Sequence, residues 1–231
     1  MKPDSEPRGG RVLAIGDVHG CLTALRTLDK RVAFGPEDLV ITLGDYVDRG
    51  PDSKGVIDYL IALRKRTKLI TLRGNHEVMM LSARSQGLDY FEAWLRSGGE
   101  PTLLSYGAAS LDEIPKPHWE FIESTLPFYE TRTHFFVHAN VFPHLPLREQ
   151  PDSVIYWERI STHEPRHCSG KTMVCGHTPQ QSGKPLNLGH TVCIDTWVYG
   201  EGWLTCLDVT SGQYWQANQR GEQAEGRLES P

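Results

Sequence analysis

The sequence lacks a long apolar run, an excess of positive charge and any repeat of the solenoid type. No apolar stretch approaches about 18 residues, so we expect no membrane-spanning helix and no membrane partner. The net charge is -5 at pH 7, which argues against a protein that grips nucleic acid through its overall field. The composition, with 39% hydrophobic and 23% charged residues, fits a soluble globular protein, in which a local basic pocket is still possible.

Cysteine is scarce, with five in 231 residues, and no pair has Cys-x-x-Cys spacing. An odd number without that spacing argues against a disulfide framework and indicates a reducing cytoplasm. Cys175, Cys193 and Cys206 lie in apolar runs, so we expect them to be small buried side chains. Residues 1–10 are polar and lack the apolar core of a signal peptide, which predicts a flexible tail.

Three short apolar runs, 11–15, 38–43 and 68–73, each end in a glycine that is followed by polar side chains. β-Branched residues within the runs predict buried strands. Polar residues at such ends need a compensating partner if they are buried. The three motifs are Gly16-Asp17-Val18-His19-Gly20, Gly44-Asp45-Tyr46-Val47-Asp48-Arg49-Gly50 and Gly74-Asn75-His76-Glu77.

Between the runs, residues 21–34 and 53–63 have apolar side chains at helical spacing. The order β-α-β-α-β predicts parallel strands, whose carboxyl ends are where ligands bind in open α/β sheets. Helical patterns follow at 77–97, which Gly98-Gly99 would end, and at 115–126. Further strands are expected at 133–137, 171–175, 191–196 and 203–209, with an antiparallel component. We therefore predict one α/β domain over 11–217, two sheets packed face to face, and a disordered tail over 218–231.

His138 and His177 also follow predicted strands, so five strand ends carry oxygen or imidazole groups. Imidazole suits transition metals, whereas carboxylate and amide oxygens suit harder ions. Such a set exceeds one tetrahedral site. It suits two ions about 3.5–4 Å apart that share a carboxylate, an arrangement used for in-line displacement at phosphorus.

The three motifs, with the later single histidines, resemble the metallophosphoesterase superfamily over roughly residues 12–209. More narrowly they resemble the phosphoprotein phosphatase family, in its small bacterial and phage serine/threonine branch. The resemblance implies a calcineurin-like α/β fold of two packed mixed β-sheets flanked by helices, with the active site at the carboxyl ends of the strands. It also implies two divalent ions, manganese being the expected metal in vitro and iron or zinc the alternatives.

The same resemblance implies roles for individual residues. A hydroxide between the two ions would attack phosphorus in line, without a phosphoenzyme. The first ion would be held by Asp17, His19 and the bridging Asp45. The second would share Asp45 and be completed by Asn75, His138 and His177.

Other positions match residues that act on the substrate. His76 matches a proton donor to the leaving oxygen, and Asp48 its orienting partner. Arg49, Arg73 and Arg159 match arginines that contact phosphate oxygens. For Asp48, a salt bridge with Arg49 or Arg73 is the alternative interpretation.

The resemblance favours a phosphorylated protein or peptide as substrate. A rival is a symmetrical diadenosine tetraphosphate hydrolase, whose branch typically lacks an aspartate at the Asp48 position. An inactive binding module on the same fold is a further alternative, although such proteins usually lose ligands. The order His138-Ala139-Asn140 and Trp197, where glycine is usual in this branch, depart from the family pattern and bear on the substrate groove.

Overall fold

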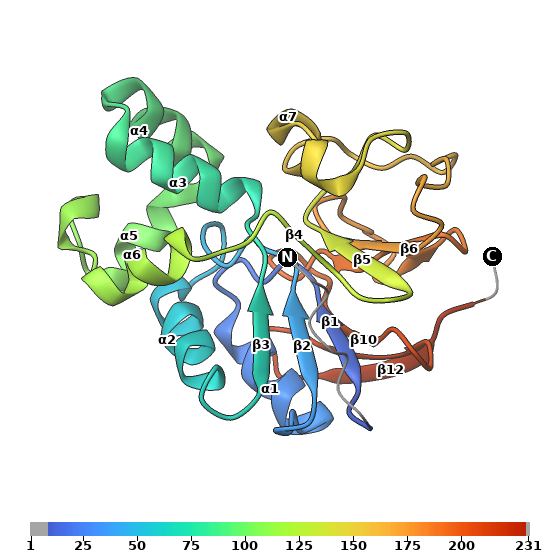
Figure 1. Cartoon of the computed structure of the whole chain (residues 1–231). Coiled ribbons are helices and arrows are strands. Elements are labelled where there is room, and N and C mark those ends of the chain that lie inside the picture. The colour runs from blue at the N-terminus through green and yellow to red at the C-terminus, as the bar shows by residue number, and fades with distance from the viewer. Residues whose placement is uncertain (1–8, 230–231) are drawn as a thin grey trace.

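Two mixed β-sheets pack against each other in the computed structural model, which describes residues 9–229, and helices cover the outside (Figure 1). The expected two-sheet α/β fold is confirmed. Of the segment predicted to be a flexible N-terminal tail, residues 1–8 lie outside the described residues. The observed fold is thus the one that the resemblance implies. The strand order gives its details.

The first sheet has the order β12-β11-β10-β1-β2-β3, with β9 paired to β10. β1, β2 and β3 run parallel, as the helical crossovers require, and β10 lies antiparallel to β1. The strands are β1 (Val12–Ile15), β2 (Leu39–Thr42), β3 (Lys68–Thr71), β9 (Asp195–Thr196), β10 (Trp203–Asp208), β11 (Gln213–Ala217) and β12 (Gln223–Arg227).

The second sheet has the order β4-β5-β6-β8-β7. Its three central strands β5, β6 and β8 are parallel, and the edge strands β4 and β7 are antiparallel to their neighbours. The strands are β4 (Phe128–Glu130), β5 (His134–Val137), β6 (Thr172–Cys175), β7 (Leu186–Asn187) and β8 (Thr191–Cys193).

Alternate side chains of each strand serve different layers of the core. Ala14 and Ile41 of the first sheet lie in the same cluster as Phe136 and Val174 of the second, so this cluster joins the sheets. Ile15, whose neighbour Ala14 faces the sheet interface, belongs instead to the cluster that packs under the helices. Fully burying each such side chain stabilises the fold by about 1.5–3 kcal/mol.

Helices flank the sheets on their outer faces (Figure 1). Their apolar stripes, such as Leu25 and Leu28, are buried in the cluster that also holds Ile15. The α-helices are α1 (Leu22–Val32), α2 (Ser53–Leu63), α3 (Asn75–Ser85), α4 (Leu88–Trp94), α5 (Glu100–Tyr106), α6 (Lys116–Glu123) and α7 (Asp152–Ile155).

The helical segment between β3 and β4 is more divided than the sequence pattern predicts. Instead of one helix over 77–97, α3 and α4 are followed by a π-helical turn, Leu95–Gly99, and then by α5. Gly98 has a φ of 109°, which a glycine tolerates, and its carbonyl accepts a hydrogen bond from the Arg49 N–H at 2.9 Å. The glycine break therefore connects this helical layer to the loop after β2.

The prediction of a disordered tail over 218–231 is wrong for β12, and residues 230–231 lie outside the described residues. β12 pairs with β11 over five residues, from Gln213 opposite Arg227 to Ala217 opposite Gln223. Its composition is polar because it is the edge strand, with every second side chain exposed. Polar composition misled the prediction, since an edge strand gains stability from backbone pairing as well as from apolar burial.

Candidate metal centre

Five strand ends meet between the helical layer and the second sheet, where the arrowheads of β1 to β3 point in Figure 1. Asp17 follows β1, Asp45 follows β2, and Asn75 begins α3 just after β3. His138 and His177 follow β5 and β6 of the second sheet. Parallel strands in both sheets thus bring residues 160 positions apart into one cluster, where the His177 N–H donates to Asp17 Oδ2 at 3.0 Å.

The backbone at this cluster is unusual. Seven non-glycine residues between 9 and 229 have positive φ, and six of them lie at or beside the strand ends. Such conformations cost about 1–3 kcal/mol each and gather at functional sites. The six are His19, Asp45, Asp48, Arg49, His177 and Trp197; the seventh is Ala33, the C-cap of α1.

Asp45 lies at the centre of the cluster and is almost fully buried. Its Oδ2 lies 3.3 Å from His19 Nε2, and its Oδ1 lies 3.5 Å from His138 Nε2. Burial alone would raise the pKa of Asp45, but His138 and the other surrounding histidines outweigh it and hold the pKa below its usual range. The carboxylate is therefore ionised and available as a shared ligand.

Two further features of the fold bring Asp45 close to α3. A Cβ at Gly74 would lie 2.1 Å from Asp45 Oδ1, so only glycine allows this approach. The first turn of α3 then donates the His76 N–H to the same oxygen at 3.1 Å. The positive end of the helix dipole thus supports the negative charge of the carboxylate.

Asn75 joins the two later histidines. Its Oδ1 lies 2.9 Å from His138 Nε2 and 3.0 Å from His177 Nδ1. Burial, together with neighbouring His138, lowers the pKa of His177 to about 4, so its imidazole is neutral at physiological pH. A neutral imidazole is the form that binds metals.

The donor set fits two cations. Potential ligand atoms of two groups lie within 4.8 Å of one another: His19, Asp45 and His76 in one, and Asp45, His138 and His177 in the other. Asp45 belongs to both. The buried Asp17 Oδ1 has no hydrogen-bond partner among the described residues, and burial, with Asp195 and Asp45 adding to it, raises the pKa of Asp17 well above its usual value. A cation would offset each of these unfavourable features.

His76 is held by Asp48 rather than left free to rotate. Its Nδ1 lies 2.7 Å from Asp48 Oδ2, while its buried Nε2 has no partner within the described chain. Asp48 also accepts hydrogen bonds from Trp94 Nε1 at 2.9 Å and Thr102 Oγ1 at 2.7 Å. The salt bridge with Arg49 or Arg73, which was the alternative role for Asp48, is replaced by these contacts.

The protonation of His76 reflects opposing influences. Burial lowers its pKa, but the carboxylates of Asp45 and Asp48 outweigh burial and raise the pKa above its ordinary value. His76 belongs to the same group of potential metal ligands as His19 and Asp45, and its ring meets that of His19 edge-on with centroids 4.7 Å apart. The geometry is therefore compatible with either a proton donor or a metal ligand at this position.

The three predicted phosphate-binding arginines differ in position. Arg49 NH1 lies 3.2 Å from His19 Nε2, inside the cluster. Arg159 is close enough for its charge to contribute to the low pKa of His177. Arg73 instead donates to Thr125 Oγ1 at 3.0 Å and to the Glu123 carbonyl at 2.9 Å, so it braces the chain after α6.

Several residues at the site were not predicted. Glu77 is fully buried, and its carboxylate accepts the N–H groups of Asp45 and Tyr46 at 2.8 Å and of Gly74 at 2.9 Å. Burial, with Asp45 adding to it, raises the pKa of Asp195 to about 7 although the Trp197 N–H partly opposes the shift. Asp195 follows an apolar run, as the predicted ligands do, so the sequence held a signal for it. Trp94 and Thr102 had none.

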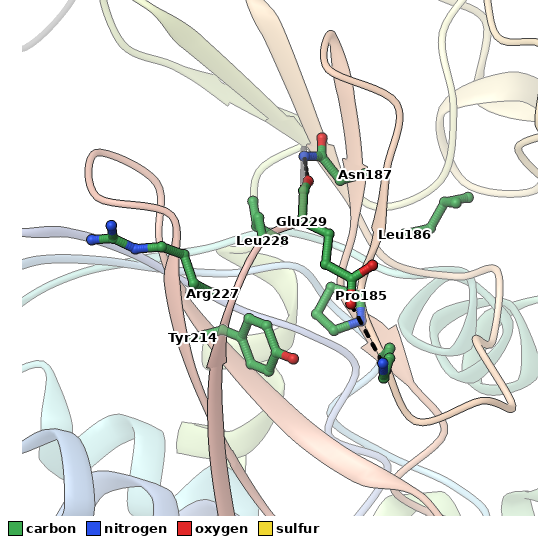
Figure 2. Close-up of a pocket in the computed structure, with 8 residues that line it drawn as sticks. Pro185, Leu186, Asn187, Tyr214, Arg227, Leu228 and Glu229 are labelled. Atoms are coloured by element: carbon green, nitrogen blue, oxygen red, sulfur yellow. Dashed lines mark hydrogen bonds and ion pairs between the residues drawn. The ribbon is translucent and has the colours of Figure 1, made fainter. Parts of the chain in front are cut away.

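A separate pocket of about 250 Å³ lies between β7, an edge strand of the second sheet, and the end of β12, an edge strand of the first (Figure 2). It is lined by residues 184–187 beside and within β7, by Tyr214 of β11, and by residues 227–229 at the end of β12. Lys184 Nζ and Glu229 Oε1 at its rim lie 3.4 Å apart, and both side chains are exposed. None of its lining residues belongs to the cluster around Asp45.

Comparisons with known proteins agree on the fold and divide on the substrate. "Serine/threonine-protein phosphatase 1" of Salmonella typhimurium is 39% identical over 90 residues, which cover 38% of this chain and 39% of that protein. "Bis(5'-nucleosyl)-tetraphosphatase, symmetrical" of Pseudomonas syringae pv. syringae is 34% identical over 140 residues, covering 60% and 44%. The matches thus span less than half of the length of either relative.

Among solved structures, a cold-active protein-tyrosine phosphatase of Shewanella superposes with a TM-score of 0.66. The superposition covers 97% of this chain and 85% of that one at 17% identity, which shows a shared fold. No helix between residues 9 and 229 is long and apolar enough to cross a membrane. Residues 10–200 match the family model described as "Calcineurin-like phosphoesterase". The chain therefore belongs to the calcineurin-like metallophosphoesterases.

Proposed function

We propose that this metallophosphoesterase hydrolyses phosphate monoesters of serine and threonine in proteins. The observation that carries the proposal is the Asp48–His76 pair, whose 2.7 Å contact leaves His76 Nε2 buried and unpartnered beside the metal-ligand cluster. A serine or threonine alkoxide is a poor leaving group and needs a proton donor. The pair supplies one where such an ester would lie.

The cluster would hold two divalent ions, with manganese as the metal to supply in vitro. Asp17, His19 and Asp45 would bind one, and Asn75, His138 and His177 would share Asp45 in binding the other. When bound, the ions would lower the pKa of a water and neutralise charge on the phosphate. His76 would then remain outside the ligand set.

The remaining residues bind, orient and protonate the substrate. The planar guanidinium of Arg49 offers paired donors to phosphate oxygens, and Arg159 adds positive charge near His177. Asp48 fixes the ring of His76 so that Nε2 faces the cluster. Arg73 would have to leave its contacts with Thr125 and the Glu123 carbonyl to bind phosphate, so it contributes least to this proposal.

A second candidate is the symmetrical hydrolysis of dinucleoside tetraphosphates. Relatives that bear this name match up to 60% of the chain, more than the phosphatase relative does. Asp48 argues for the monoesterase. Cleavage of the phosphoanhydride would release a nucleoside diphosphate, which needs little protonation, so the Asp48–His76 pair would have no proton to donate in that reaction.

The test is a comparison of substrates with the manganese-supplied protein. We expect kcat/KM for phosphoserine and phosphothreonine peptides to exceed that for diadenosine tetraphosphate. Asp45→Asn is the matched control and should lose both activities. A preference for the dinucleotide would establish the second candidate, and inactivity on every substrate with metals bound would establish a binding module.

A further inference from the structure

Tyr199 lies in the loop between β9 and β10 and is half-buried against the cluster. Its ring meets the His19 ring edge-on, with centroids 4.7 Å apart and an interplanar angle of 81°. The Arg49 guanidinium carbon lies 4.6 Å from the centroid of the same ring. One aromatic side chain thus contacts both a proposed metal ligand and a proposed phosphate-binding group.

We propose that Tyr199 is a positioning residue that holds the Arg49 guanidinium over the cluster, ready for a phosphate group. This inference rests on the phosphate-binding role given to Arg49 above. It extends that role to a residue on a different strand connection, 150 positions along the chain.

Arg49 needs such support because of how its contacts are distributed. Its backbone is fixed, since φ is 67° and the N–H donates to the Gly98 carbonyl at 2.9 Å. The guanidinium, by contrast, contacts the Tyr199 ring and His19 Nε2, which are not anions. No carboxylate between residues 9 and 229 forms an ion pair with this guanidinium, although its charge acts on nearby Asp195. The Tyr199 ring is therefore a main support for the end of the Arg49 side chain. A cation over an aromatic face is attracted by the negative potential of that face.

Trp197 braces the ring that supports Arg49. The two aromatic rings meet at 84° with centroids 6.3 Å apart. Trp197 keeps a left-handed φ of 65°, and its indole covers Gly200, where a Cβ would lie 2.4 Å from Cε2. The loop thus accepts strain at Trp197 while placing two rings edge to face beside the cluster, which is consistent with a rigid support rather than a loose connection.

The experiment measures inorganic phosphate binding to the manganese-loaded protein by calorimetry, together with metal content and melting temperature. We expect Tyr199→Leu to weaken phosphate binding roughly three- to tenfold while two metals remain bound. With p-nitrophenyl phosphate, KM should rise more than kcat falls. Tyr199→Phe keeps the ring and should retain most of the affinity, and Tyr90→Leu, an exposed tyrosine of α4, is the control.

A double-mutant cycle identifies the route of the effect. Arg49→Ala should weaken phosphate binding, and adding Tyr199→Leu to it should cost little more, because the supported group is already gone. Full additivity would overturn the proposal. So would loss of a metal ion in Tyr199→Leu, which would mean that Tyr199 acts through His19 instead. Tyr199→Met replaces Tyr199→Leu if the latter does not fold.

These outcomes are independent of the physiological substrate. If the protein prefers diadenosine tetraphosphate to phosphopeptides, the monoesterase proposal fails, whereas phosphate affinity still reports on Tyr199. If phosphopeptides are hydrolysed and Tyr199→Leu binds phosphate as the unaltered protein does, only the positioning role fails.

Discussion

At the scale of single residues, His76 is the group whose role the geometry leaves between two chemistries. Its Nδ1 is held by Asp48, its Nε2 is buried without a partner among the described residues, and the proposed ligands His19 and Asp45 belong to the same group of potential metal ligands. If His76 is a proton donor, its substitution should reduce kcat more for poor leaving groups than for good ones. If it is a metal ligand, the reduction should not depend on the leaving group. Substitution of this residue can therefore separate them.

We expect His76→Asn to keep two metal ions but to lose about 10²–10⁴-fold in kcat toward phosphoserine peptides, the range typical of general acid catalysis. The loss should be smaller with p-nitrophenyl phosphate, because nitrophenolate leaves without a proton. Metal analysis and steady-state kinetics check both points. Asp48→Asn should show the same pattern in milder form. Loss of a metal ion, or equal losses on the two substrates, would make His76 a ligand or a phosphate-binding group.

At the scale of secondary-structure elements, an ion pair joins the starts of β1 and β2. Asp38 Oδ2 accepts from Arg11 NH2 at 2.6 Å and from the Gly35 N–H at 2.9 Å. Burial would raise the pKa of Asp38, but these hydrogen bonds outweigh it and hold the pKa below its usual value. The pair therefore stabilises the folded state only while Asp38 is ionised.

Asp38→Asn should lower the free energy of unfolding at pH 7 by about 1–3 kcal/mol. Because the folded-state pKa lies below the unfolded value of about 3.9, the contribution is complete above that value. It is lost as pH falls through the folded pKa, so the difference from the unaltered protein should shrink below about pH 4. Urea unfolding at several pH values measures this. Glu92→Gln, in an exposed pair, should change stability little at any pH; a pH-independent Asp38 effect would contradict the linkage.

β12 is a second element whose contribution can be measured. Removal of residues 218–231 would unpair β11 over five residues and remove Leu228 from the cluster between the sheets. We expect a loss of about 1–3 kcal/mol, or several degrees in melting temperature, without loss of metal. Scanning calorimetry and metal analysis check this. A melting temperature equal to that of the full chain would show that β12 adds nothing to stability.

At the scale of the whole molecule, the candidate metal centre takes its residues from both sheets. Asp17, Asp45 and Asn75 come from the strand ends of the first sheet, whereas His138 and His177 come from those of the second. Ions bound there would link the two sheets at the carboxyl ends of their parallel strands. Metal binding should therefore be coupled to global stability.

Chelation should lower the melting temperature, and manganese should restore it. Binding at 100 times the dissociation constant adds about 2.7 kcal/mol for one site. Thermal unfolding across a manganese titration measures the effect. Asp45→Asn, which alters the shared ligand, should show a much smaller response, while Leu228→Ala should respond as the unaltered protein does. A melting temperature that ignores manganese in all three proteins would contradict the coupling.

Much of the candidate site was predictable because its proposed ligands follow strands. His138 comes directly after an apolar run, whereas Asp17, Asp45, Asn75 and His177 come after the glycine that ends one, and parallel strands bring such ends to one edge. The partners of Asp48 were not predictable. Trp94 and Thr102 reach it from 46 and 54 residues away, through a helical layer whose breaks depend on packing. β12 was not predictable for a similar reason. Its polar composition predicted a disordered tail, whereas its strand depends on pairing with β11.

The sequence by itself determined the two-sheet α/β class and the strand ends that carry the proposed ligands, because apolar runs and the glycines that end them are local properties. Tertiary structure decided which partners the arginine side chains near these strand ends contact. Arg49 joined the cluster and Arg73 braced Thr125, although both follow strands. The physical reason is that a long cationic side chain takes the best partners within reach. Those partners, Tyr199 for Arg49 and the chain after α6 for Arg73, are set by contacts far along the sequence.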